Sequence, residues 1–138
     1  MTTVKTIYQG ELRTEAVHVA SGVKIITDAP VDNQGKGESF SPTDLLAASL
    51  GSCMLTIMGI AARTHGFNID GTQVEILKKM ASDPRRVSGI EVKFDFPEIN
   101  YDLRVRKIIE KAALTCPVTL SLHPDIEQKV IFNFFESV

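Results

Sequence analysis

The sequence has 138 residues, of which 43% are hydrophobic and 23% are charged, and its formal net charge is −2. This length and balance predict one soluble domain, residues 1–138, large enough for a core of its own. The scattered lysines and arginines and the nearly neutral total exclude the basic surface that binding to nucleic acid or to an anionic membrane requires.

The N-terminal segment, MTTVKTIYQGE, has no basic start followed by an apolar run and no site that resembles a signal-peptide cleavage site. We therefore expect a cytoplasmic protein. Because the cytoplasm is reducing, the two cysteines, Cys53 and Cys116, should exist there as thiols and not as a structural disulfide.

Three short strands are predicted at the start of the chain. Residues 3–9 and 11–19 flank Gly10 and indicate a hairpin, and residues 23–27 indicate a third strand. The segment 28–40, DAPVDNQGKGESF, combines proline, glycine and acidic residues without an apolar period, so a loop is predicted there. Long ordered loops often line functional sites.

A long helix is predicted over residues 41–66, SPTDLLAASLGSCMLTIMGIAARTHG, with Cys53 in its middle. Ser41 has the position of an N-cap and Asp44 follows three residues later, which is typical of a capping box. Pro42 suits the first helical position, and Gly66 marks the end of the helix.

This helix carries no charged side chain from Leu45 to Ala62, so a membrane span has to be considered. Small and polar residues dilute its hydrophobicity, and the flanks lack a basic cluster and an aromatic belt. The diluting residues are Ser49, Gly51, Ser52 and Thr56. We expect a buried core helix whose small residues let other elements approach its backbone closely.

Two strands are predicted next, at residues 72–80 and 87–96, because apolar and polar residues alternate there. An amphipathic helix follows at 100–115, and its stripe extends to Cys116, about 20° from Val105 around the axis. The other stripe residues are Ile108, Ile109, Ala112 and Ala113. The second thiol is therefore expected to face the core.

Pro117 ends that helix, and a short helical turn and a last strand at 128–135 complete the chain. Hairpins clustered in sequence, with helices between them, favour an α+β fold with antiparallel sheets. Both sheets should pack around the helix that carries Cys53.

From spacing alone, the two thiols have two interpretations. They can form a redox pair, in which one thiolate is oxidised to a sulfenic acid and the other condenses with it, or they can be small buried core residues. A metal site is less favoured, because the cysteines and His18, His65 and His123 lack ligand spacing such as Cys-x-x-Cys.

Two motifs carry a resemblance to a known family. The run FSPTDLLAASLGSCMLTIMGIAA, Phe40 to Ala62, is followed some sixty residues later by TCPVTLSL, Thr115 to Leu122. This combination of a proline-led, small-residue helix containing cysteine with a second Cys-Pro-Val resembles the OsmC/Ohr superfamily of cysteine-based hydroperoxide reductases. The resemblance extends over nearly the whole chain, including the predicted strands.

The resemblance implies an intertwined homodimer with antiparallel sheets packed around a long central helix. It also implies that Cys53 is the peroxidatic cysteine and Cys116 the resolving one. An arginine of the N-terminal hairpin holds the thiolate in the family, and Arg13 matches it.

A glutamate at the start of the central helix holds this arginine in the family. Here Thr43 and Asp44 stand ten and nine residues before Cys53, so the holding acid is either the shorter Asp44 or Glu38 in the preceding loop.

The activity that the resemblance implies is reduction of organic hydroperoxides, and of hydrogen peroxide less well, by a thiol peroxidase. No bound cofactor is expected. An external dithiol, of the lipoyl type in relatives, would return the enzyme to its thiol form. Two other hypotheses stay open: a non-catalytic stress protein that binds a small hydrophobic ligand, and a thiol redox sensor.

Overall fold

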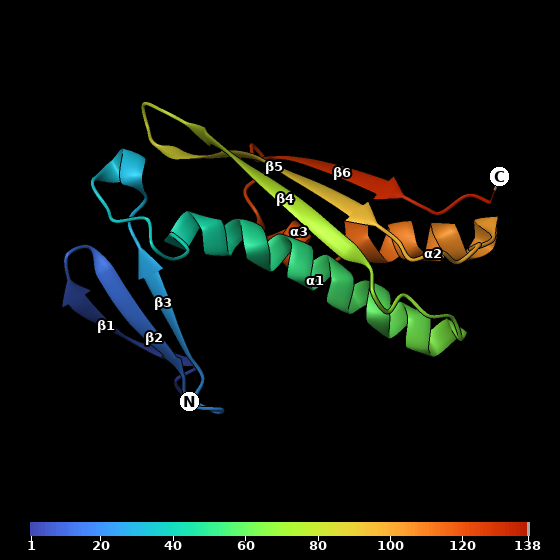
Figure 1. Cartoon of the computed structure of the whole chain (residues 1–138), viewed down its shortest axis with the longest axis horizontal. Coiled ribbons are helices and arrows are strands. Elements are labelled where there is room, and N and C mark those ends of the chain that lie inside the picture. The colour runs from blue at the N-terminus through green and yellow to red at the C-terminus, as the bar shows by residue number, and fades with distance from the viewer. Residues whose placement is uncertain (138) are drawn as a thin grey trace. The chain divides into compact units, whose positions relative to one another are not determined.

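In the computed structural model, which describes residues 1–137, the chain divides into two compact units, one ending at Leu46 and the other beginning at Ala47. Each unit holds a three-stranded sheet (Figure 1). Helices and sheets together form the mixed α+β fold predicted from the sequence. The expectation of a single domain stays a prediction.

The first unit contains the three predicted N-terminal strands, β1 (Val4–Gly10), β2 (Arg13–His18) and β3 (Lys24–Asp28). They pair antiparallel in the order β1-β2-β3. Glu11 and Leu12, with φ of 56° and 62°, form the turn between β1 and β2, and Gly10 is the last residue of β1. Gly22, with a φ of 76°, lies in the connection between β2 and β3, where the left-handed backbone favours glycine. The antiparallel pairing confirms the predicted hairpin and third strand.

Backbone hydrogen bonds within the loop after β3 fix its conformation. It contains a short 3-10 helix, η1 (Val31–Asn33), and the N–H of Gly35 donates to the carbonyl of Pro30 at 2.9 Å. The N–H of Asp28 donates to the carbonyl of Phe40 at 3.0 Å, so the two ends of the loop are tied together. An ordered loop was the prediction for this segment.

The long helix α1 (Pro42–His65) has the predicted caps. The N–H of Asp44 donates to Ser41 Oγ and the N–H of Ser41 donates to Asp44 Oδ2, both at 3.0 Å, which completes a capping box. At the other end Gly66 has a φ of 76°, and its N–H donates to the carbonyl of Ala62. Local signals therefore set both ends of this helix.

The second unit contains β4 (Gln73–Ala81), β5 (Arg86–Asp95) and β6 (Glu127–Asn133), in that order across the sheet. β4 and β5 pair antiparallel as expected, but β6 runs parallel to β5. The physical reason is the connection, which crosses back through α2 (Leu103–Leu114) and α3 (Pro117–Ser121). A parallel neighbour needs such a crossover.

Helices α1 and α2 lie on the same side of this sheet (Figure 1). Helix α1 approaches the sheet closely at Gly51, where an added Cβ would come 2.5 Å from Ile76 Cδ1 on β4. Close approach at a small residue was predicted for this helix. The core between the layers is fully buried and includes Leu50, Met54, Met58, Val92, Phe94 and Ile109.

Helix α1 has the length and composition of a membrane span, and the core helix of a soluble protein has the same properties. Its side chains Leu50, Met54 and Met58 have no exposed surface, so one face of α1 lies in the core, whereas Ile60 on another face is 56% exposed. We describe α1 as a core helix. The cytoplasmic location stays a prediction.

Candidate active site

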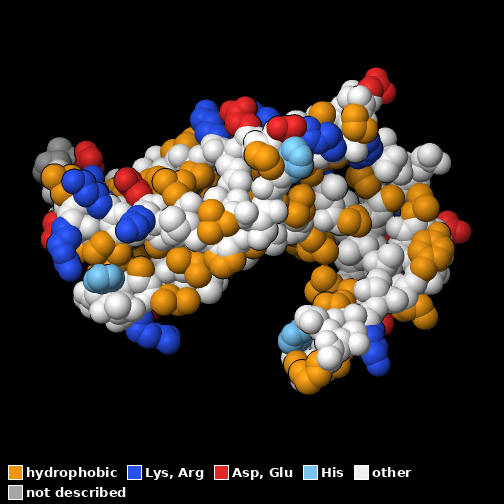
Figure 2. All heavy atoms as spheres, turned by 180° about the vertical axis from the view of Figure 1, so that it is seen from behind, with side chains coloured by type: hydrophobic (Ala, Val, Ile, Leu, Met, Phe, Trp, Pro, Cys, Tyr) orange, Lys and Arg blue, Asp and Glu red, His pale blue; other side chains and the backbone are white. Residues whose placement is uncertain are grey.

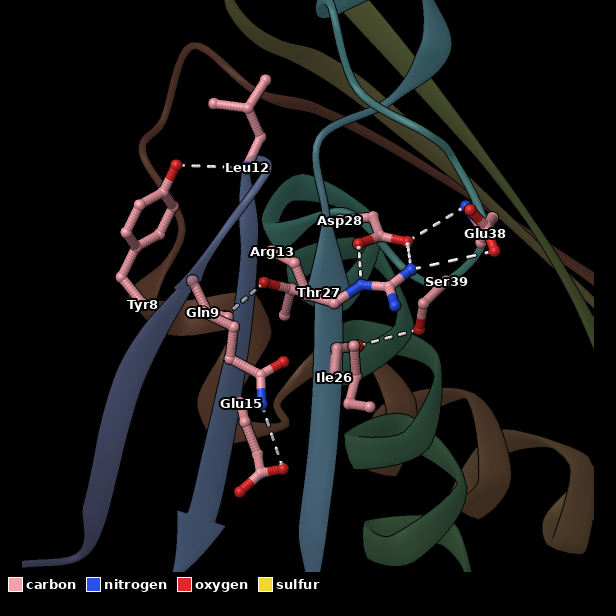
Figure 3. A network of polar contacts seen from close by, with 11 residues as sticks. Tyr8, Gln9, Leu12, Arg13, Glu15, Ile26, Thr27, Asp28, Glu38 and Ser39 are labelled. Carbon is pink, nitrogen blue, oxygen red and sulfur yellow. Dashed lines mark hydrogen bonds and ion pairs between the residues drawn. The ribbon is translucent and has the colours of Figure 1, made fainter.

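One candidate group of functional residues is an ion pair between two strands of the first unit. Arg13 on β2 stands directly opposite Asp28 on β3. Arg13 Nε donates to Asp28 Oδ1 at 2.7 Å and Nη2 donates to Oδ2 at 2.8 Å. This two-point geometry fixes the plane of the guanidinium group (Figure 3).

Asp28 is the buried member of this pair, with 1% of its side chain exposed. Its carboxylate also accepts a hydrogen bond from the N–H of Glu38 at 3.1 Å. The hydrogen bonds from Arg13 hold the pKa of Asp28 below its ordinary value, against the opposing effect of burial. The same hydrogen bonds raise the pKa of Arg13. Both groups are therefore charged at neutral pH.

The two acids expected to hold Arg13 have other positions. Glu38 Oε2 lies 3.9 Å from Arg13 Nη2 and its side chain is 64% exposed, so it is a secondary partner. Asp44 closes the capping box of α1. Within residues 1–137 the acid that holds Arg13 at two points is Asp28, which the sequence analysis missed.

A signal for Asp28 was present in the sequence. The turn around Gly22 sets the register of the second hairpin, and that register places residue 28 opposite Arg13. The predicted third strand ended at residue 27, one position short of the carboxylate. Extending the register across the hairpin would have found the pair.

The guanidinium group keeps some of its donors uncommitted. Among the residues that the structure describes, Arg13 Nη1 has no hydrogen-bond partner, while Nε and Nη2 face Asp28. The side chain is 29% exposed. Two N–H donors are thus available to an anionic group that approaches this side of Arg13.

A second candidate group consists of the two thiols, both in the second unit. Cys53 lies on α1 and is half-buried, whereas Cys116 precedes α3 and is fully buried. Both are free thiols. The buried position of Cys116 confirms the prediction that this thiol faces the core. The helical stripe itself does not reach it, because α2 ends at Leu114 and the backbone of Cys116 is extended.

Cys116 is the N-cap of α3 and makes two hydrogen bonds to Thr119. Its thiol donates to Thr119 Oγ1 at 3.1 Å, and the N–H of Thr119 donates to Cys116 Sγ at 3.4 Å. The side chain of Cys116 is therefore held in one orientation.

Burial and neighbouring groups shift the pKa of the Cys53 thiol in opposite directions. Burial raises the pKa of the Cys53 thiol, the backbone N–H of Val118 lowers it by hydrogen bonding, and the nearby thiol of Cys116 raises it again. The structure thus brings together the two predicted cysteines. Arg13 belongs to the other unit, so its contact with Cys53 stays a prediction.

Possible metal ligands do not cluster in the part of the chain that the structure describes. Residues 1–137 contain no group of three or more His, Cys, Asp or Glu side chains that could hold a metal ion. His18 Nδ1 is hydrogen-bonded to Ser21 Oγ at 2.6 Å, and His123 Nδ1 accepts a hydrogen bond from the N–H of Asp125 at 3.0 Å. These two histidines have local roles in turns.

The family model described as OsmC-like protein matches residues 35–130, which is more than half of the chain. The chain belongs to the OsmC-like protein family. The match includes α1 with Cys53 and the Cys-Pro-Val motif at Cys116.

Solved structures share the OsmC-like fold. A Psychrobacter arcticus protein, described as a candidate osmotic stress induced and detoxification response protein, is 60% identical over 96% of each chain, with a TM-score of 0.92. A Legionella pneumophila organic hydroperoxide resistance protein OsmC is 14% identical over 97% of this chain and 98% of its own, with a TM-score of 0.75.

An organic hydroperoxide resistance protein from Elizabethkingia anophelis, with bound thiocyanate, is 16% identical over 96% of each chain, with a TM-score of 0.74. At these identities the two hydroperoxide resistance proteins establish a shared OsmC-like fold only. No curated protein matches the chain significantly.

Proposed function

We propose that this OsmC-like protein is a thiol peroxidase that reduces organic hydroperoxides, and hydrogen peroxide less well. The observation that carries the proposal is the contact between a half-buried thiol, Cys53, and a buried thiol, Cys116. Two free thiols in contact can be oxidised to a disulfide and reduced again. Membership of a family that includes hydroperoxide resistance proteins supports the same activity.

The first step is oxidation of Cys53. Its thiolate attacks the distal oxygen of the hydroperoxide, a sulfur–oxygen bond forms, and the oxygen–oxygen bond breaks. The remaining oxygen leaves as an alkoxide and takes up a proton to become the alcohol. Cys53 is then a sulfenic acid, and the hydroperoxide has been reduced by two electrons.

The second step is resolution by Cys116. Its sulfur attacks the sulfur of the Cys53 sulfenic acid, the sulfur–oxygen bond breaks, and water is released as the disulfide forms. An external dithiol, of the lipoyl type by analogy with relatives, then reduces the disulfide by thiol–disulfide exchange and becomes a disulfide itself. The cycle needs no bound cofactor, and we place it in the reducing cytoplasm.

Arg13 is proposed to stabilise the Cys53 thiolate and the negative charge that develops in the first step. Its Nη1 donors are uncommitted within residues 1–137, and Asp28 fixes the plane from which they project. The neighbouring cation would lower the pKa of Cys53 and so oppose the effect of burial. Asp28 is the positioning group for Arg13 in this proposal.

A homodimer is part of the proposal. The strands of the first unit leave large apolar side chains exposed, as the hydrophobic surface in Figure 2 illustrates. These side chains are Val4, Ile7, Tyr8, Ile25 and Ile26. Exposed apolar surface of this kind is typical of a surface that a second subunit covers.

The deciding experiment is a single oxidation followed by intact mass and free-thiol analysis. Reduced protein is exposed briefly to cumene hydroperoxide, alongside a Cys116→Ser variant. We expect the wild type to lose both thiols and two hydrogen atoms of mass. The variant should stop at a sulfenic acid on Cys53 that dimedone traps.

Hydrogen peroxide at the same concentration should oxidise Cys53 more slowly than cumene hydroperoxide. If both thiols survive excess hydroperoxide, the peroxidase proposal is wrong. A non-catalytic protein that binds a small hydrophobic ligand then becomes the better hypothesis.

A thiol redox sensor is the second candidate function. Burial raises the pKa of Cys53, which reduces the thiolate fraction at neutral pH and favours slow, stoichiometric oxidation over fast turnover. Multiple-turnover kinetics with dihydrolipoamide distinguish the two candidates. A peroxidase consumes many equivalents of hydroperoxide per subunit, whereas a sensor stops after one.

A further inference from the structure

We propose that Thr119 is a positioning residue for the resolving step, which prepares Cys116 to attack the oxidised Cys53. The inference rests on the proposed peroxidase function and adds a residue to it. Thr119 holds the Cys116 sulfur with both its backbone N–H and its hydroxyl group.

Hydrogen bonds fix both the backbone and the side chain of Thr119. Its backbone carbonyl accepts a hydrogen bond from Gln128 Nε2 on β6 at 3.2 Å, so the sheet fixes the backbone of Thr119. Its Oγ1 lies 3.1 Å from Cys116 Sγ, and its N–H lies 3.4 Å from the same sulfur. The first turn of α3 thereby controls where the Cys116 sulfur lies.

The Thr119 hydroxyl group matters because Cys116 changes from a hydrogen-bond donor to an acceptor when its thiol becomes a thiolate in the resolving step. As a thiol, Cys116 donates to Thr119 Oγ1. As the thiolate that attacks the sulfenic acid, it has no proton to donate and needs donors. The Thr119 hydroxyl can rotate and donate, and the N–H continues to donate, so the thiolate receives two hydrogen bonds.

Val118, the residue before Thr119, contacts the other sulfur. The N–H of Val118 hydrogen-bonds to the Cys53 sulfur, while the N–H of Thr119 hydrogen-bonds to the Cys116 sulfur. Consecutive residues of α3 thus hold the two sulfurs that must join. In the attack the Cys116 sulfur forms a bond to the Cys53 sulfur, and hydroxide leaves and is protonated to water.

Ordinary helix capping does not account for the hydroxyl contact. The N–H of Thr119 alone satisfies the capping role of Cys116. The matched comparison in the same helix is Ser121, whose hydroxyl donates to the carbonyl of Pro117 at 2.7 Å and contacts neither sulfur. Removing the Ser121 hydroxyl tests α3 itself without touching Cys116.

The test compares wild type with Thr119→Val, Thr119→Ser and Ser121→Ala in single turnover with cumene hydroperoxide. Dimedone trapping and intact mass follow the Cys53 sulfenic acid, and loss of free thiols follows the disulfide. The two steps are thereby timed separately in each protein. Circular dichroism checks that each variant is folded, and Thr119→Ala replaces Thr119→Val if the latter is not.

We expect Cys53 to be oxidised at the same rate in all four proteins. Disulfide formation in Thr119→Val should be about tenfold slower, the effect of losing one hydrogen bond to a charged group, and more sulfenic acid should be trapped. Thr119→Ser should resolve at close to the wild-type rate because it keeps a hydroxyl. Ser121→Ala should do the same.

A second measurement, the pH dependence of disulfide formation, separates stabilisation of the Cys116 thiolate from simple misplacement of the Cys116 sulfur. If the hydroxyl stabilises the thiolate, the deficit of Thr119→Val shrinks as pH rises from 6 toward 10, because more thiolate forms without help. Cys53, the titratable group that faces Cys116 from α1, is oxidised at this stage in every protein compared. A deficit that does not change with pH overturns the proposed charge effect.

The two proposals fail in different ways. If wild-type Cys53 is never oxidised, the peroxidase function fails and the role of Thr119 fails with it. If the wild type forms the disulfide and Thr119→Val forms it equally fast, the function stands and the inference about Thr119 is wrong. Equal slowing in Ser121→Ala would likewise assign the effect to α3 and not to the hydroxyl.

Discussion

Arg13 and Asp28 stand directly opposite each other in the β2–β3 ladder, and their side chains form a two-point ion pair. Asp28 is almost completely buried, whereas Arg13 is partly exposed. A buried carboxylate needs a partner, so the pair fixes the guanidinium group from the inside and leaves Nη1 to face outward from Asp28.

The first prediction concerns the rate of Cys53 oxidation. Replacing Arg13 by alanine removes the proposed cation and should slow the oxidation about 100-fold, as loss of a donor to a developing charge does in other enzymes. Asp28→Asn keeps the cation but loosens it, so the slowing should be about tenfold. Stopped-flow measurement of cumene hydroperoxide consumption in a single turnover gives both rates.

Glu38→Gln is the matched control for these variants. It removes an exposed carboxylate 3.9 Å from the same guanidinium group, and its effect should stay below about threefold. If Arg13→Ala oxidises as fast as the wild type, Arg13 does not belong to the site. If Glu38→Gln is slowed more than Asp28→Asn, the holding acid has been assigned to the wrong residue.

The second prediction concerns stability and pH. Arg13 holds the pKa of folded Asp28 below the ordinary 3.8, so the folded chain binds this proton more weakly than the unfolded chain does. The stabilisation is fully present above pH 3.8 and is lost as the pH falls through the lowered pKa. Urea unfolding should show wild type more stable than Asp28→Asn at pH 6, with the gap closing in acid.

The comparison needs unfolding curves from pH 6 to pH 2 at constant ionic strength. Glu38→Gln, which removes an exposed carboxylate of the same network, should follow the wild type more closely than Asp28→Asn does. A gap between wild type and Asp28→Asn that widens toward low pH would contradict the lowered pKa of Asp28.

The sequence predicted those parts of the fold that local chemistry decides. Ser41 and Gly66 set the ends of α1, and Gly22 marked the connection between β2 and β3. The apolar stripe that begins at Val105 predicted the burial of Cys116 correctly, although α2 ends two residues before it. In each case the signal lies within one turn or one helical face.

Relationships between distant segments were harder to predict. The partner of Arg13 depends on the register across β2 and β3, and the direction of β6 depends on where the α2–α3 connection returns. The direction of β6 is recorded in no local pattern, and the turn around Gly22 indicates Asp28 only after its register is extended across the hairpin. The contact between the two thiols likewise requires α1 and α3 to meet, which spacing along the chain left open.

The third prediction concerns two glycines of α1. At Gly51 an added Cβ would lie 2.5 Å from Ile76 Cδ1, so Gly51→Ala should destabilise the protein by about 1 kcal/mol after the better helix propensity of alanine is allowed for. At Gly59 no atom of residues 1–137 outside the nearby turns of the helix lies within 4 Å of the added atom, so Gly59→Ala should stabilise it by up to about 1 kcal/mol. Urea unfolding measures both changes.

A double-mutant cycle identifies the cause. Ile76→Val removes the Cδ1 methyl group that an alanine at position 51 would meet. The double variant Gly51→Ala with Ile76→Val should therefore be more stable than the sum of the single changes predicts, by about 0.5 kcal/mol or more. Strict additivity would show that the cost at position 51 has another origin.

The fourth prediction concerns the ionisation of Cys53. The Cys116 thiol is one of the groups that raise the pKa of Cys53, together with burial, which is the larger cause. Removing it in Cys116→Ala should therefore shift the pH dependence of Cys53 alkylation by iodoacetamide to lower pH. Peptide mass spectrometry after timed alkylation at a series of pH values follows Cys53 alone in both proteins.

The control for this prediction is Ser121→Ala, which changes α3 without contacting either sulfur, and its profile should coincide with that of the wild type. A profile of Cys116→Ala that stays in place would mean that Cys116 does not act on Cys53 in the resting protein. A shift to higher pH would mean that Cys116 favours the thiolate of Cys53, which is the reverse of the effect that the geometry predicts.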